Sequence, residues 1–198
     1  VAALTGTLKM SEGFSGFANS AIWLIVGAFL FSRGFIKTGL GKRIAYNLIS
    51  AFGSSSLRLA YALALSDLIL APATPSNTAR VGGVIMPITT SLAKAFGSEP
   101  QDGPRKIGSF LMQSIYQVNT ITSAMFQTSM AGNTLVAALA LQSFGIGITW
   151  GDWAMAAIVP GIIALIIMPY FIYKVYPPEI KDAREAQQMV REELKGLG

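Results

Sequence analysis

The chain has 198 residues, of which 52% are apolar and 13% charged, and it contains neither Cys nor His. This balance is too apolar for an ordinary soluble domain and indicates an integral membrane protein, without disulfides, thiol chemistry or the commonest zinc ligands. The net charge of +5 does not indicate a nucleic-acid partner, because the Lys and Arg residues are spread between apolar runs.

The first two predicted elements are a spanning helix and a helix on the membrane surface. Residues 20–38 are apolar enough to cross a hydrocarbon core of about 30 Å, with Trp23 near one interface and Arg33 and Lys37 near the other. Residues 40–53 are too short to span, and their pattern predicts an amphipathic helix that lies in the interface. Its apolar stripe contains Leu40, Ile44, Leu48 and Phe52.

Residues 57–96 read as two apolar arms joined by a polar turn at 71–79. Pro72 and Pro75 stop the first arm, and the three residues that follow are types that cap a helix start. The first arm has about 14 residues and reaches about 21 Å, which favours a re-entrant hairpin over two spanning helices. The three capping residues are Ser76, Asn77 and Thr78.

The remaining elements are a long polar-centred run, a second spanning helix and a tail. Residues 107–144 are too long for one simple span and are crowded with small polar residues in their middle, which predicts a helix unwound there. Residues 153–174 predict another spanning helix, and 177–198 a charged helical tail.

The basic residues favour one side of the membrane. Twelve of the 15 Lys and Arg residues lie within 37–58, 94–106 and 174–198, which the predicted topology places together. By the positive-inside tendency that side is the cytoplasm, so the hairpin opens from the cytoplasmic face.

Three groups of polar residues are candidates for a site. Ser76, Asn77 and Thr78 offer donors for a carboxylate and oxygens for a small cation such as Na⁺, or they simply cap the helix. Asp67 and Arg80 lie inside apolar runs on either side of the turn and could face each other as an ion pair. Arg80 could alternatively assist anion binding or stand in for a bound cation. The polar middle of the long run, residues 122–134, suits either an unwound site or helix packing.

Residues 70–87, LAPATPSNTARVGGVIMP, resemble the divalent anion/sodium symporter family, and within it the citrate/succinate antiporters and 2-oxoglutarate/malate translocators. Residues 34–46 and 52–57 resemble the same subgroup. The resemblance implies a homodimeric transporter built from two inverted repeats, each with a Ser-Asn-Thr hairpin tip and an unwound helix. It matches Ser76, Asn77 and Thr78 to the first tip, and Gly132 and Asn133 to the first unwound helix. The chain has one such tip, so we expect an N-terminal repeat half that lacks its C-terminal half.

These observations predict an all-α integral membrane fragment of a secondary transporter, in a multi-pass bacterial inner-membrane protein. Its substrates are expected to be di- or tricarboxylates of the citrate, succinate, malate and 2-oxoglutarate class, moved by exchange because Arg80 supplies a permanent positive charge. The predicted substrate ligands are Ser76, Asn77, Thr78, Arg80 and Asn133. A possible Na⁺ at Ser76, Asn77 and Gly132 is the one cofactor considered, and sodium-coupled symport is the alternative mode. An anion channel remains a further alternative, as does an enzyme, although no His, Cys or evident carboxylate pair is available for catalysis.

Overall fold

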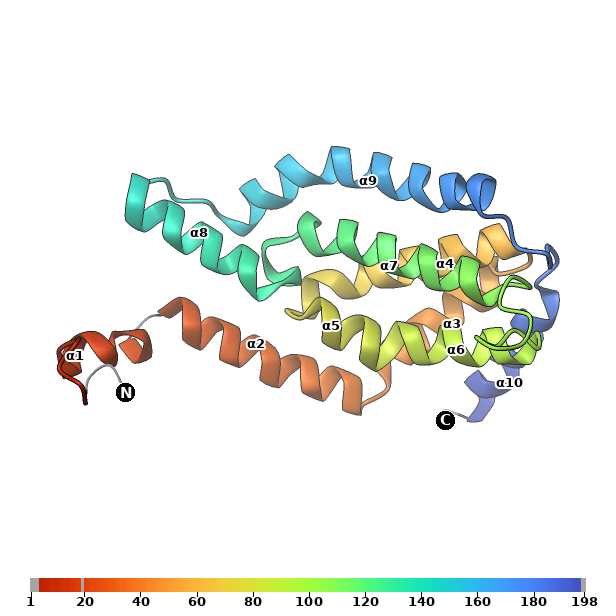
Figure 1. The fold of residues 1–198 in the computed structure, drawn as a ribbon, viewed down its shortest axis with the longest axis horizontal. Helices are drawn as coiled ribbons and strands as arrows, with labels where there is room; N and C mark the ends of the chain where they lie inside the picture. The colour runs from red at the N-terminus through yellow and green to blue at the C-terminus, as the bar shows by residue number, and fades with distance from the viewer. Residues whose placement is uncertain (1–3, 19, 197–198) are drawn as a thin grey trace.

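The computed structural model describes residues 4–18 and 20–196, and the regular elements formed by these residues are all helical. Figure 1 shows an elongated bundle, with the short α1 set apart from it near the N-terminus. The longer helices are α2 (Ser20–Lys37), α3 (Leu40–Phe52), α4 (Ser56–Leu70), α6 (Met86–Ala95), α7 (Gly108–Met125), α8 (Ala131–Phe144), α9 (Trp150–Val175) and α10 (Arg184–Gly196). The short α-helices are α1 (Met10–Gly13) and α5 (Asn77–Arg80).

Helix α4 and the helices that follow it form a hairpin. Ser55 caps the start of α4 by accepting the N–H of Arg58, and the chain turns through a 3-10 segment, η2 (Ala71–Ala73). It then returns through α5, a π-helical segment η3 (Val81–Ile85) and α6. In Figure 1 the hairpin starts at the end of the molecule that carries α10, and its tip lies part way along the long axis.

The run 107–144 contains two helices, because α7 ends at Met125 and α8 begins at Ala131. The intervening backbone is extended at Phe126 and Met130, with one 3-10 turn, η4 (Gln127–Ser129), between them. Figure 1 places this interruption beside the hairpin tip, with α8 continuing beyond it toward the other end of the molecule.

Helix α9 lies along α7 and approaches it closely. A Cβ added at Gly161 would come 2.6 Å from Cγ of Met125, so the absence of a side chain there permits the contact. Trp153 donates through Nε1 to the backbone oxygen of Ala124, 2.9 Å away. Helix α9 contains Pro160 and Pro169 and still runs unbroken from Trp150 to Val175.

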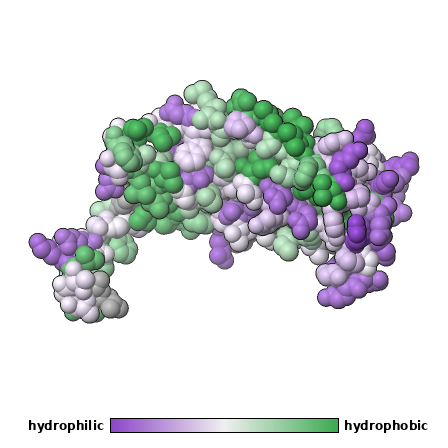
Figure 2. All heavy atoms as spheres, turned by 45° about the horizontal axis from the view of Figure 1, so that its top comes forward, coloured by the Kyte–Doolittle hydropathy of each residue, from purple (hydrophilic) through white to green (hydrophobic). Residues whose placement is uncertain are grey.

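Polar residues gather at the end of the molecule that carries α10, where Figure 2 shows a hydrophilic surface. The residue stretch before α10 is tied to the hairpin base, because Ser56 N–H donates to Lys181 O and Ala183 N–H donates to Ser54 O. Helix α10 packs against α3 through buried Ala186 and Val190. We call this region, residues 53–58, 97–106 and 177–196, the charged end.

Two stretches are long and apolar enough to cross a membrane, judged by length and composition within the described residues. They are Ser56–Ala73, with 18 residues, and Trp150–Val175, with 26. The first contains the arm predicted at 57–70. It begins one residue earlier, at Ser56, and η2 extends it to Ala73. The length argument for a re-entrant arm therefore no longer discriminates between the two topologies.

The stripe predicted on α3 is divided in the structure. Ile44 and Leu48 are half-buried against the core, whereas Leu40 and Phe52 are exposed. The face that α3 buries most deeply consists of other residues, because α10 and the hairpin pack on that side. These are Gly41, Ala45, Tyr46 and Ile49.

Candidate functional site

Side chains donate hydrogen bonds to the backbone carbonyl groups that lose their helical partners at the interruption between α7 and α8. Asn133 Nδ2 lies 2.7 Å from the backbone oxygen of Ser123 and 2.9 Å from that of Phe126. Ser129 Oγ lies 2.6 Å and 2.7 Å from the same two oxygens. Because buried backbone groups need such partners, Ser129 and Asn133 make a non-helical backbone tolerable at this depth in the bundle.

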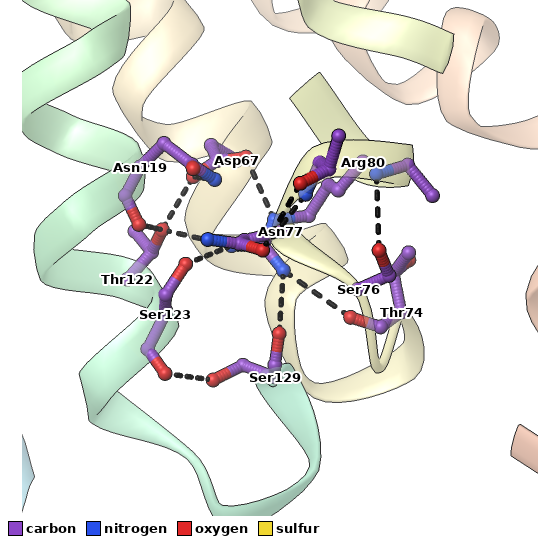
Figure 3. A network of polar contacts seen from close by, with 11 residues as sticks. Asp67, Thr74, Ser76, Asn77, Arg80, Asn119, Thr122, Ser123 and Ser129 are labelled. Atoms are coloured by element: carbon purple, nitrogen blue, oxygen red, sulfur yellow. Dashed lines mark hydrogen bonds and ion pairs between the residues drawn. The ribbon is translucent and has the colours of Figure 1, made fainter. Parts of the chain in front are cut away.

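The guanidinium of Arg80 joins the hairpin tip to the interruption. The side chain is 0% exposed, and its Nε donates to Oδ1 of Asp67 at 2.8 Å. Nη1 donates to the backbone oxygens of Thr74, in the tip, and Ser129, in the interruption, each 3.2 Å away. A single cation therefore bonds carbonyl groups from both broken segments (Figure 3).

Helix α7 completes the shell around this ion pair. Arg80 Nη2 donates to Oγ1 of Thr122 at 3.2 Å and to Oγ of Ser123 at 3.1 Å, which brings all five guanidinium N–H donors into use. Thr122 in turn donates to Oδ2 of Asp67, and Asn119 Nδ2 lies 3.4 Å from the same oxygen. Asp67 is 2% exposed, so the ion pair is enclosed, and its two charges balance each other.

The three residues of the predicted tip motif are more accessible than Arg80 and bond mainly to their own turn. Ser76 Oγ accepts the N–H of Ala79 at 3.2 Å, which is an N-cap. Asn77 Oδ1 accepts the N–H of Thr78 at 2.9 Å, and the described residues supply no acceptor for the Asn77 amide N–H2. Ser76 and Asn77 are half-buried and Thr78 is exposed.

A second contact fixes the tip against the interruption. Thr128 Oγ1 donates to the backbone oxygen of Pro72 at 2.7 Å and accepts the indole N–H of Trp150 at 3.0 Å. The tip, the interruption and the start of α9 are thus connected through one hydroxyl group.

The ion pair that the sequence suggested between Asp67 and Arg80 is present in the structure, across the hairpin. Arg80 lies at the tip, but its donors are all engaged within the protein and its charge is balanced. Asn133 and Gly132 lie at the start of α8, where the Asn133 amide closes the end of α7.

Sequence reasoning did not identify Thr122 and Ser123 as partners of Arg80. The signal available was that Thr122 and Ser123 lie in the polar middle of the run, with Asn119 one helical turn before them.

One groove among the described residues lies away from this polar cluster, between α6, α7 and α9. It measures about 920 Å³ and its lining is mostly apolar, including Met112, Met168 and Phe171. Such a surface offers little to a dianion, so the polar groups at the tip and the interruption remain the candidate site.

Comparison with known proteins gives the family. The model of the sodium:sulfate symporter transmembrane region matches residues 1–198, and the chain belongs to this family of transmembrane transporters. It is 57% identical over 199 residues to YflS of Bacillus subtilis (strain 168), named as a candidate malate transporter, covering 100% of this chain and 42% of the relative.

Two other relatives carry more specific names. Dicarboxylate transporter 1, chloroplastic, of Spinacia oleracea is 50% identical, with 98% of this chain and 34% of the relative covered. The L-tartrate/succinate antiporter of Escherichia coli (strain UTI89 / UPEC) is 40% identical, with 96% and 39% covered. The chain thus spans less than half the length of each of these relatives.

Proposed function

We propose that the full-length protein is a secondary transporter that exchanges dicarboxylates across the membrane, with related di- and tricarboxylates such as citrate and 2-oxoglutarate as further candidate substrates. The observation that carries the exchange mode is the position of Arg80 Nη1 between the carbonyl oxygens of Thr74 and Ser129. Carbonyl oxygens from a broken helix and a hairpin tip are groups that could coordinate Na⁺, and here a fixed cation bonds them.

Asp67 lies beside the guanidinium that occupies these oxygens. Arg80 does not add a free positive charge to the site, because Asp67 lies 2.8 Å away and balances it. The support for exchange is therefore the occupation of these oxygens by a guanidinium. The name of the tartrate/succinate antiporter is consistent with that mode.

In this proposal Asn77 is the principal substrate ligand of this half. Its amide N–H2 can donate to a carboxylate without breaking a bond inside the protein, and Ser76, Thr78 and Asn133 complete the surroundings. Arg80 holds the tip in place and acts on the substrate through that geometry. In the alternative mode, sodium symport, Ser76, Asn77 and Gly132 would surround the ion.

We further propose that residues 57–96 form a re-entrant hairpin opening to the cytoplasm, in a multi-pass inner membrane protein. The rest of the polypeptide would supply a second Ser-Asn-Thr tip in an inverted repeat, and the complete protein would be a homodimer. Positive charge at the charged end supports this orientation.

The test uses the full-length protein in proteoliposomes. We expect labelled succinate to enter only when the vesicles contain a dicarboxylate, and Asn77→Ala to reduce uptake by at least tenfold while the protein remains monodisperse. Uptake into empty vesicles driven by a sodium gradient would contradict exchange. Uptake by the Asn77→Ala variant at the wild-type rate would contradict the assignment of the site.

A further inference from the structure

A groove on the outside of the bundle lies where the C-terminal end of α3 meets the first turns of α4. It measures about 450 Å³ and is lined by Ala51, Phe52, Arg58, Tyr61, Ala62 and Leu65. It is separate from the polar cluster at the hairpin tip. The groove lies near the start of α4, whereas the tip follows the last residue of α4, Leu70. One basic residue is thus set among apolar and aromatic ones.

Arg58 has most of its hydrogen-bonding capacity unused. Its side chain is exposed, and among the described residues its one side-chain bond runs from Nη1 to Oγ of Ser54 at 3.1 Å. None of the described carboxylates lies within ion-pair distance of it, since Asp67 and Asp182 are paired with other arginines. The guanidinium can therefore accept an anionic partner, and its fork geometry suits a phosphate group.

Helix α9 contacts Tyr61 of α4 and carries a second cation and a second tyrosine further along its length. Tyr61 of α4 donates through its hydroxyl to the backbone oxygen of Ile166. One turn further along α9, the ammonium group of Lys174 lies 5.5 Å from the ring centre of Tyr170. Tyrosines beside Lys or Arg are typical of the zone where a membrane protein meets lipid head groups.

An exposed apolar stripe leads away from Arg58 along α4. Leu65 and Ile69 are 39% and 47% exposed, and their spacing places them on the same helical face as Arg58. The helical rise gives about 16 Å between residues 58 and 69, which is close to half of a hydrocarbon core of about 30 Å. The stripe is therefore as long as one leaflet is deep, and Ile166 of α9, whose backbone oxygen accepts from Tyr61, is also exposed.

We propose that this surface binds one anionic phospholipid from the leaflet at the charged end, with its phosphate on Arg58 and an acyl chain along Leu65 and Ile69. Charge complementarity identifies this occupant, because an uncompensated arginine begins an apolar stripe of leaflet length. Basic residues in pockets between membrane helices bind anionic lipid head groups. The inference does not depend on which substrate the protein transports.

The experiment measures lipid retention by native mass spectrometry of the full-length protein. The protein is exchanged into detergent with equal amounts of phosphatidylglycerol and phosphatidylcholine carrying the same acyl chains. We expect preferential retention of phosphatidylglycerol, and a loss of about fivefold in that preference in Arg58→Gln, the effect of one basic residue at an anionic surface. Arg58→Lys should keep most of the preference.

Lys94→Gln is the matched control, because it removes one positive charge at the end of α6, outside this groove. It should leave the preference unchanged. Equal retention of the two lipids by the wild type, or a full preference in Arg58→Gln, would overturn the proposal. Displacement of the lipid by glycerol phosphate at equal concentration would also overturn it, because the chains would then contribute nothing.

Discussion

The described part of the chain contains two Asp–Arg pairs that differ in burial and in the separation of their residues along the sequence. Asp67 and Arg80 are 2% and 0% exposed and come from opposite arms of a hairpin, whereas Asp182 and Arg184 are 56% and 74% exposed and two residues apart. The exposed pair bonds within one turn at the charged end. In the buried pair, Arg80 also donates to two carbonyl groups and two hydroxyl groups on separate segments. The pair therefore holds the hairpin tip, the interruption and α7 together.

Replacing Asp67 by Asn should have the largest effect on stability. It leaves Arg80 buried without a counter-charge, and breaking such a pair costs about 3–5 kcal/mol. The expected result is a strongly lowered midpoint of thermal unfolding for the full-length protein. The measurement is fluorescence-detected size-exclusion chromatography after heating to a series of temperatures.

The matched control removes both charges. Asp67→Leu combined with Arg80→Met should recover part of the stability, because no buried charge is left behind. The remainder should stay lost, because the carbonyl oxygens of Thr74 and Ser129 no longer have the guanidinium as a donor. The double variant should not recover uptake, since the guanidinium no longer joins the tip to the interruption and, among the described residues, only the Thr128 hydrogen bond to Pro72 remains between them. Equal stability of the single variant and the wild type would mean that the pair does not organise this region.

Asn133→Ala should have the next largest effect. It deprives the backbone oxygens of Ser123 and Phe126 of a buried donor, for an expected loss of about 1–3 kcal/mol in the free energy of unfolding. Asn47→Ala serves as the control, because Asn47 donates to Arg43 O on an exposed helix face. Equal losses in the two variants would show that burial does not distinguish these amides.

The polar turn was predictable because Pro72 and Pro75 interrupt an apolar run and capping residues follow them. The family resemblance was confirmed by the family model. The ion pair of Arg80 with Asp67 was predictable from their positions on either side of the turn. The hydroxyl partners of Arg80 were not predictable, because Thr122 and Ser123 are more than forty positions away and no local pattern relates them to the hairpin. The length of the first arm was underestimated, since η2 continues helical winding through Pro72, which is compatible with a first turn.

Ser76→Ala should have a smaller effect, about 1 kcal/mol, because it removes the N-cap of α5. Ser55→Ala removes the equivalent cap of α4 at the charged end and should cost a similar amount. The two variants separate stability from function, because only Ser76→Ala should also lower succinate exchange. A loss of exchange in both would show that caps, and not the site, control transport.

Asp182→Asn should have the smallest effect at neutral pH, because solvent screens the exposed pair. Hydrogen bonds from the Arg184 side chain and backbone lower the pKa of the Asp182 carboxyl to about 2. A lowered pKa contributes stability above the unfolded value of about 4, and the contribution is lost as the pH falls toward 2. The difference between variant and wild type should therefore shrink over this range, measured by thermal unfolding at each pH. A difference that grows as the pH falls would contradict the lowered pKa of Asp182.

The π-helical segment Val81–Ile85 directly follows Arg80. A π turn holds one residue more than an α turn, so it rotates everything before it by about 100° relative to a continuous α-helix. Arg80 can then point at Asp67 and α7 while Ile85, Ile88 and Leu92 stay in the core. The orientation of the tip is therefore encoded in the number of residues in this arm as well as in their identity. Among diverging sequences, a one-residue deletion between 81 and 85 would turn Arg80 away from its partners while leaving every side chain of the cluster intact.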